Sequence, residues 1–168
     1  NARSKSGSND WKFGANVYYE TQLDTSPETY LAANDVDDDD NTTIDVFASG
    51  PIIKDHLFFY ALYSDNNTSE YYAGVQSEQA FDYSVDEGFY GIKIDGYLTD
   101  NHHLEYTLFS DERTGVEGVF GFNPDTGQQG AYLGDNNYEE GGDNWIATYT
   151  GNFGNSLTLS VSYGENEA

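Results

Sequence analysis

The sequence predicts an all-β fold: an antiparallel up-and-down meander of about seven strands that forms part of a transmembrane β-barrel. Three observations carry this prediction. Apolar and polar residues alternate with a period of two over segments of roughly 9–11 residues, a length that suits a tilted membrane strand. Aromatic residues make up 16% of the 168-residue chain, and Tyr, Phe and Val fall within these segments. The connections alternate between short and long, as they do in outer-membrane barrels.

The clearest element is a hairpin at residues 49–63, with the sequence SGPIIKDHLFFYALY. Gly50 can take a positive φ, Pro51 fixes its own φ and donates no hydrogen bond, and Asp55 can bond back to nearby backbone. These residues predict a tight turn at 50–55 with both arms committed to a sheet. In the second arm, residues 57–63, both faces are apolar.

Strands on either side of the hairpin follow from the same alternation. Residues 11–20 place five apolar side chains on one face, namely Trp11, Phe13, Ala15, Val17 and Tyr19. Residues 43–49 place Ile44, Val46 and Ala48 on the apolar face, while Phe47 lies on the polar side. Each is therefore predicted to be a strand with one apolar and one polar face.

Four more strands are predicted after the hairpin, at residues 89–98, 103–111, 145–153 and 157–163. In chain order, their apolar faces are Tyr90, Ile92, Ile94 and Leu98; Leu104, Tyr106 and Leu108; Trp145, Ala147, Tyr149 and Phe153; and Leu157, Leu159, Val161 and Tyr163. Polar residues alternate with all four sets, so each segment again has a period of two.

The short connections are predicted at one end of the strands and the long connections at the other end. Short turns are predicted near 50–55, 99–102 and 153–156. Long acidic loops are predicted at 21–41, 64–87 and 112–143, because these stretches lose the alternation and contain Pro27, Pro124 and many glycines. Within the second loop, residues 71–86 are ambiguous, because the pieces 71–72 and 81–85 are strand-like. In a barrel these three loops would be extracellular.

The barrel interpretation assigns the two faces. Charged residues on the polar face would point into a water-filled lumen: Lys12, Asp45, Lys93, Asp95 and Glu105. Aromatic residues near strand ends would form the interfacial girdles: Trp11, Tyr19, Tyr63, Tyr90, Trp145, Phe153 and Tyr163. A soluble β-sandwich is the alternative, in which the aromatic faces form a core between two sheets.

Composition excludes several classes of protein. The chain has 30 acidic and six basic residues, a net charge of −24, so it lacks the basic footprint that nucleic-acid binding requires. It has no cysteine, which excludes disulfides, thiolate metal sites and a cysteine nucleophile. No run approaches the roughly 20 apolar residues of a membrane helix.

Three segments carry a family resemblance. RSKSGSND at residues 3–10 resembles the segment where the plug meets the barrel in TonB-dependent outer-membrane receptors, with Ser4 in place of the family's threonine. GPIIKDHLFF at residues 50–59 is similar to a periplasmic hairpin of the Oar-like branch of that family, with Ser49 where a glycine is usual. LTDNHHL at residues 98–104 resembles a later periplasmic turn.

This resemblance implies a fragment of a TonB-dependent receptor in the outer membrane of a Gram-negative bacterium. Residues 1–10 would be the end of the plug, and residues 11–168 the first strands of a barrel of about 22. The family performs energy-coupled uptake of a bulky nutrient. Its implied partners are outer-membrane lipid and lipopolysaccharide, an unknown substrate, and the TonB complex, which would act through a plug segment absent from this chain.

The sharpest local feature is an acidic run that contains Asp35, Asp37, Asp38, Asp39 and Asp40. Carboxylates are the ligands that Ca²⁺ prefers, so a loosely bound Ca²⁺ is one interpretation and a solvated acidic loop is the other. An EF-hand is excluded because its sixth and twelfth positions would be Asp40 and Val46, where glycine and glutamate are required.

No catalytic constellation is present, so an enzyme is not expected. His102 and His103 are adjacent and would point to opposite faces of a strand, where they cannot chelate one metal together. No cofactor is expected apart from the possible Ca²⁺. Three functions therefore remain: a receptor for nutrient uptake, a soluble extracellular β-sandwich that binds or adheres, and a passive porin-like channel.

Overall fold

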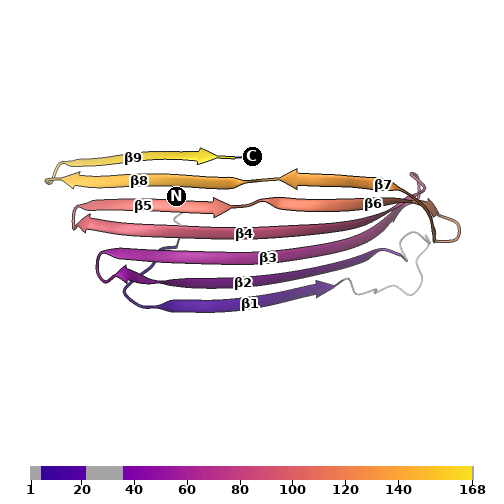
Figure 1. The fold of residues 1–168 in the computed structure, drawn as a ribbon, viewed down its shortest axis with the longest axis horizontal. Coiled ribbons are helices and arrows are strands. Elements are labelled where there is room, and N and C mark those ends of the chain that lie inside the picture. Colours follow the sequence, from indigo (N-terminus) through magenta and orange to yellow (C-terminus); the bar gives the residue numbers. More distant parts are fainter. Residues whose placement is uncertain (1–4, 22–35, 168) are drawn as a thin grey trace.

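The computed structural model describes residues 5–21 and 36–167, which form one antiparallel sheet without a helix (Figure 1). The nine strands are β1 (Lys12–Thr21), β2 (Asp38–Ile53), β3 (Leu57–Gly74), β4 (Gln79–Thr99), β5 (His102–Ser110), β6 (Arg113–Asn123), β7 (Gln128–Glu140), β8 (Asp143–Phe153) and β9 (Leu157–Asn166). The predicted all-β antiparallel meander is confirmed for these residues. The sheet is open: β1 and β9 are the edge strands of the main path, and β7, which pairs with β6 alone, is an edge strand of the distal part. Over the same described ranges, no helix has the length and apolar character needed to cross a membrane.

Seven strands pair in the predicted order, β1-β2-β3-β4-β5-β8-β9. The prediction of about seven strands is nevertheless too low, because β6 and β7 add a further pair beside β4. Figure 1 shows that β6 continues the line of β5 and that β7 continues the line of β8. The sheet thus has a seven-stranded part at the turn end and a longer distal part built from β2, β3, β4, β6 and β7.

The long loop predicted at 64–87 is wrong. β3 and β4 pair without interruption from Leu57–Gly96 to Gly74–Gln79, and only residues 75–78 form the turn. At about 3.3 Å per residue, the 21-residue β4 is roughly 65 Å long. Polar residues occupy both faces of this extension, so the hydrophobic alternation that marks a strand is missing, although the ladder of backbone hydrogen bonds continues.

The long loop predicted at 112–143 is also wrong, because it is the β6–β7 hairpin. A kink separates this hairpin from β5 and β8, and Gly141 takes a φ of 81° there. The Asp111 carboxylate holds the kink by accepting hydrogen bonds from the Gly142 backbone N–H (3.3 Å) and the Asn144 amide (3.2 Å). Of the third predicted loop, 21–41, residues 38–41 belong to β2 and residues 22–35 lie outside the described ranges.

The turn of the hairpin predicted at residues 49–63 differs in one detail. Asp55, not Gly50, has the positive φ, at 66°, and β2 runs through Pro51 to Ile53 with a bulge. Gly50 is required for a different reason: a Cβ there would lie 2.8 Å from the Trp11 ring. The ring therefore packs directly on the backbone of β2.

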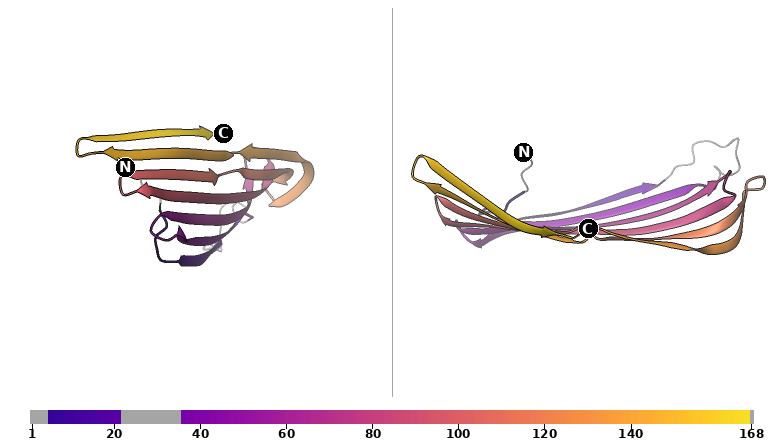
Figure 2. Two further views of the ribbon diagram at one scale, coloured as in Figure 1. Left: turned by 60° about the vertical axis from the view of Figure 1, so that its left-hand side comes forward. Right: turned by 90° about the horizontal axis from the view of Figure 1, so that it is seen from above.

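The two faces of the sheet have different character. Cross-strand partners share a face, and the chain of partners Lys12, Ser49, Tyr60, Lys93 and Thr107 defines the first face. In Figure 2 the ends of the strands bend toward one side, and the N-terminal segment lies on that side. Because this segment contacts Lys93, we call the first face the concave face.

The opposite face carries an apolar band over β1–β5, β8 and β9. Its members are Phe13, Val17, Ile44, Val46, Leu57, Phe59, Ala61, Tyr63, Tyr90, Ile92, Ile94, Leu104, Tyr106, Leu108, Trp145, Ala147, Tyr149, Phe153, Leu157, Leu159, Val161 and Tyr163. No described residue covers them as a second layer, and many of these large side chains are exposed. At about 3.3 Å per residue, these side chains span about 20–26 Å along β3, β8 and β9 and about 7–13 Å along β1, β2, β4 and β5. The longer stretches are close to the height of the apolar band of outer-membrane barrels.

Candidate functional site

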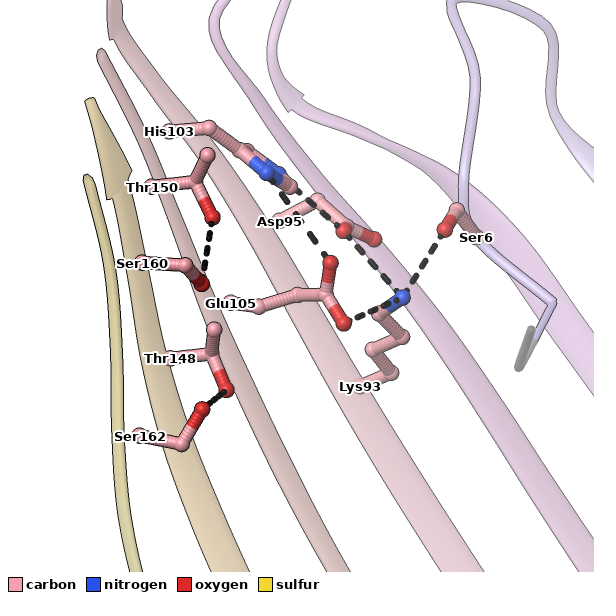
Figure 3. A network of polar contacts seen from close by, with 9 residues as sticks. All are labelled: Ser6, Lys93, Asp95, His103, Glu105, Thr148, Thr150, Ser160 and Ser162. Atoms are coloured by element: carbon pink, nitrogen blue, oxygen red, sulfur yellow. Dashed lines mark hydrogen bonds and ion pairs between the residues drawn. The ribbon is translucent and has the colours of Figure 1, made fainter. Parts of the chain in front are cut away.

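The main polar site of the concave face is a cluster of four ionisable side chains, which we call the ionic cluster (Figure 3). Lys93 and Asp95 come from β4, and His103 and Glu105 come from β5. Asp95 and Glu105 are cross-strand partners, and residues two apart on a strand share a face. The register between β4 and β5 therefore brings all four side chains together.

Ion pairs link the cluster. The Lys93 Nζ lies 3.0 Å from a Glu105 oxygen and 3.4 Å from Asp95 Oδ1, and His103 Nε2 lies 3.3 Å from the same Asp95 oxygen. The side chains of Lys93 and Asp95 are only 7% and 3% exposed, whereas those of His103 and Glu105 are half-buried. The cluster is thus a buried ion pair with two partners nearer to solvent.

Two atoms of the ionic cluster remain without a hydrogen bond although they are buried. They are Asp95 Oδ2 and His103 Nε2, whose distance to Asp95 is short but whose hydrogen-bond geometry is unfavourable. Leaving a buried polar atom unsatisfied costs about 1–3 kcal/mol, so each such atom in a folded protein calls for a partner.

The N-terminal segment, residues 5–10, packs against this region. The Lys93 ammonium donates a hydrogen bond of 3.1 Å to the Ser6 hydroxyl. Asn9 donates to the Asp55 carboxylate (2.6 Å) and accepts from the Asp55 backbone N–H (2.8 Å), which pins the segment to the β2–β3 turn. Residues 5–10, the described part of the segment predicted to be the end of the plug, therefore lie on the concave face.

Gly7 is the point of closest approach between this segment and the sheet. A Cβ at Gly7 would lie 2.9 Å from Phe58 Cβ and would also collide with the Phe59 carbonyl oxygen. We expect Gly7→Val to lift the segment and to lower its free energy of local opening by about 1–3 kcal/mol. Amide hydrogen exchange at residues 5–10 measures this effect. Gly88→Val is the matched control, because a Cβ at Gly88 meets no atom within 4 Å; equal loss of protection in both variants would contradict the close contact.

All five residues predicted to face a lumen lie on the concave face. Lys93, Asp95 and Glu105 belong to the ionic cluster, and Asp45 accepts a 2.6 Å hydrogen bond from Ser64. Lys12 is exposed on the same face. The sequence prediction of a shared face is thus matched by the register, whereas the burial of Lys93 and Asp95 was not expected.

Sequence reasoning missed an aromatic hollow of about 410 Å³ on the concave face. Phe89 and Phe109 stack at 6.2 Å between ring centroids, and the neighbouring pair Phe47 and Tyr60 stacks at 6.1 Å. Lys5 of the N-terminal segment also lines the hollow. The signal that could have found it was already visible: Phe47 lies on the polar side, and both faces of residues 57–63 are apolar.

Aromatic side chains at the end of the apolar band nearest the distal strands donate hydrogen bonds to carboxylates. Tyr19 donates to Asp40 (2.8 Å), Tyr90 donates to Asp143 (2.8 Å), and the Trp145 indole donates to Glu165 (3.3 Å). An amphipathic ring with one apolar and one hydrogen-bonded end suits an apolar–polar boundary. The band therefore ends at a row of carboxylates.

The acidic run does not form the predicted Ca²⁺ loop within the described residues. Asp38, Asp39 and Asp40 are extended in β2, so neighbouring carboxylates alternate between faces, and Asp35 lies outside the described ranges. Asp37 instead accepts a 3.1 Å hydrogen bond from the Ala73 backbone N–H. In the described part of the chain, a group of three possible metal ligands is formed by Asp95, His103 and Glu105, not by these aspartates.

A second polar cluster lies in the distal part and is centred on Glu117 of β6. Its carboxylate accepts hydrogen bonds from the Asn136 amide (2.8 Å), the Tyr72 hydroxyl (2.8 Å) and the Tyr138 hydroxyl (3.1 Å). The Asn136 hydrogen bond, followed by those of the two tyrosines, holds the Glu117 pKa below its usual value. Burial and the Glu117 hydrogen bond raise the pKa of Tyr72 to about 12.

The Glu117 cluster predicts a pH dependence. Because the folded-state pKa of Glu117 is lowered, its stabilisation is present above the ordinary glutamate pKa and is lost as the pH falls through the lowered value. Glu117→Gln should remove about 1–3 kcal/mol from the β6–β7 hairpin at neutral pH and should lower the Tyr72 pKa. Hydrogen exchange and alkaline tyrosine titration measure the two effects. The exposed Glu139→Gln is the control, and equal protection of the hairpin in both variants would contradict this role of Glu117.

Charge is distributed unevenly along the sheet. Among the described residues, Lys5, Lys12, Lys54 and Lys93 lie toward the tight turns. The distal part contains Arg113, which is already paired with Glu87 (3.0 Å) and Glu140 (3.2 Å). The distal part is therefore strongly acidic.

Comparison with known proteins identified no relative of this chain. A scan of protein-family models and searches of curated proteins and of solved structures found no match to this chain.

Proposed function

We propose that the chain is the first part of the wall of a TonB-dependent outer-membrane receptor, which takes up a bulky nutrient with energy supplied through the TonB complex. The apolar band is the lipid-facing surface, and the concave face lines the interior. The distal strands rise above the membrane as an acidic vestibule. The open edges of β1 and β9 pair with further strands of a barrel of about 22.

The observation that carries the barrel proposal is the apolar band. It crosses seven neighbouring strands, reaches about 20–26 Å along β3, β8 and β9, and ends in tyrosine and tryptophan side chains hydrogen-bonded to carboxylates. Polar groups on the other face would be solvated by an aqueous lumen. The sandwich alternative needs a second sheet against the band, and the described residues contribute none.

The N-terminal segment favours a plugged receptor over a passive porin. This segment enters from the concave face, and Gly7 and Asn9 hold it against the sheet. A chain that leaves a plug and enters the first strand of the wall would follow this path. The aromatic hollow beside Lys5 then offers an inner surface where the wall could contact the plug or apolar groups of a substrate.

Spin labels test the orientation of the sheet. Ile92 and Ile146 are both exposed isoleucines, but Ile92 lies in the apolar band and Ile146 on the concave face. A nitroxide placed at residue 92 of the full-length protein in liposomes should be relaxed by oxygen, which partitions into lipid. A nitroxide at residue 146 should respond to a water-soluble nickel complex. The reverse pattern, or a full-length protein that stays folded and soluble without detergent, would overturn the barrel.

Uptake is tested separately. Cells that express the full-length receptor should accumulate substrate only with an intact TonB complex. Uptake through a passive porin would not change when the TonB complex is deleted.

A further inference from the structure

We propose that Asp95, His103 and Glu105 form a binding site for a divalent transition metal ion of the Zn²⁺ type, on the concave face beneath the N-terminal segment. This inference goes beyond nutrient uptake and does not depend on it. Any fold that preserves the β4–β5 pairing would bring these residues together.

The geometry is close to that of a metal site. One ligand atom from each of the three residues lies within 4.8 Å of the other two. Two ligands of one tetrahedral zinc ion, each at about 2.1 Å, are about 3.4 Å apart. The Asp95 Oδ1 and His103 Nε2 atoms are 3.3 Å apart, so this pair already has the required spacing. Glu105 is half-buried and lies nearer to the other imidazole nitrogen, 3.9 Å from His103 Nδ1, so its side chain must move to complete the set.

The unsatisfied atoms are the independent observation that points to a ligand. Asp95 is 2% exposed, and its Oδ2 has no hydrogen-bond partner; His103 Nε2 is also buried and without one. Figure 3 shows both side chains directed toward the space that Lys93 and Glu105 also face. A metal ion between Asp95 Oδ1 and His103 Nε2 would give the imidazole nitrogen the partner that it lacks, and a carboxylate that binds through both oxygens would satisfy Asp95 Oδ2 as well.

The donor set selects the class of metal. An imidazole with two carboxylates suits Zn²⁺ and its neighbours in the first transition series, whereas Ca²⁺ and Mg²⁺ prefer oxygen ligands only. The chain contains three histidines and no cysteine, so a nitrogen-containing site in it must use His56, His102 or His103. His102 is directed to the opposite face, where it contacts the Tyr149 hydroxyl at 2.6 Å, and His56 lies at the β2–β3 turn.

Lys93 is the competitor for the same oxygens. Its ammonium lies between Asp95 and Glu105 and also reaches Ser6, so a metal ion must displace it. The amine can retain the Ser6 hydroxyl as a partner when it moves. Removing the amine should therefore tighten metal binding.

A different account of the cluster is a protonated His103 paired with Asp95, with no metal. The two accounts differ in whether zinc binds and in which variants change that binding. The acidic surface of the chain is a source of unspecific binding, so the measurement needs an excess of Ca²⁺ to occupy sites made of oxygen ligands alone.

The experiment titrates Co²⁺ and then Zn²⁺ into the full-length protein in detergent with excess Ca²⁺. The expected result is the visible absorption of tetrahedral Co²⁺, displaced by Zn²⁺. His103→Gln and Glu105→Gln should weaken Zn²⁺ binding at least tenfold, and Lys93→Met should strengthen it about tenfold, where tenfold corresponds to about 1.4 kcal/mol. His56→Gln, which changes a histidine outside the cluster, should leave binding unchanged.

Far-UV circular dichroism confirms that each variant is folded, and Glu105→Gln should disturb folding least because the Glu105 side chain is only half-buried. The proposal is overturned if neither wild type nor Lys93→Met binds Co²⁺ or Zn²⁺ under excess Ca²⁺. It is equally overturned if His103→Gln and Glu105→Gln bind as wild type does.

Discussion

Replacing Lys93 with methionine is expected to lower the free energy of unfolding by about 3–5 kcal/mol when no metal is available. The ammonium is the partner of Asp95, whose side chain is 3% exposed, and its loss leaves a buried carboxylate without a compensating charge. Ser6 also loses its hydrogen-bond donor. Because both side chains are buried, solvent screens this pair much less than a surface salt bridge.

Denaturant unfolding of the full-length protein in the presence of a chelator measures this effect. Lys12→Met is the control, because Lys12 lies on the same face but is exposed, and its replacement should change stability by less than about 0.5 kcal/mol. Equal effects of the two substitutions would show that the buried ion pair adds nothing specific. A double variant with Asp95→Asn should recover much of the loss, since the uncompensated charge is then gone.

Introducing a charge into the apolar band should have the second largest effect. If the band faces lipid, Ile92→Lys should destabilise the folded protein in a bilayer by about 2–4 kcal/mol. Ile92 lies in the middle of the band on β4, between its cross-strand partners Ala61 and Leu108. A lysine there would have to leave its charge in hydrocarbon or extend toward the interface at the expense of packing.

The concave face supplies the matched control for this substitution. Ile146 is 44% exposed, against 39% for Ile92, but it lies on the concave face, where its cross-strand partner is Thr107. Ile146→Lys should therefore change the free energy of folding in liposomes by less than about 0.5 kcal/mol. If the two variants are equally stable in liposomes, the two faces meet the same solvent and the proposed orientation is wrong.

Much of the fold was predictable where one face of a strand is apolar. Residues 11–20, 57–63 and 157–163 alternate clearly, and each lies in a strand that pairs with its predicted neighbours. The distal strands were missed for the complementary reason. In residues 64–70 and 128–140 both faces are polar or glycine-rich, so no hydrophobic period distinguishes a solvated strand from a loop.

The candidate site was predictable only in part. Alternation correctly placed Lys93, Asp95 and Glu105 on one face, and adjacency correctly placed His102 and His103 on opposite faces. Sequence spacing says nothing about which residue of β5 lies beside Asp95. That pairing depends on the tight turn between the two strands and on the bulge between Tyr97 and Thr99.

Local alternation was enough to predict the all-β class, the order of seven strands and the division of each strand into an apolar and a polar side, because a period of two is a local property of an extended chain. The cross-strand register, the burial of the ionic cluster beneath residues 5–10, and the continuation of polar segments as β6 and β7 became visible in the folded sheet alone. These features depend on backbone hydrogen bonds and close packing between residues that are distant in the chain. The local pattern of polar and apolar residues does not predict such contacts.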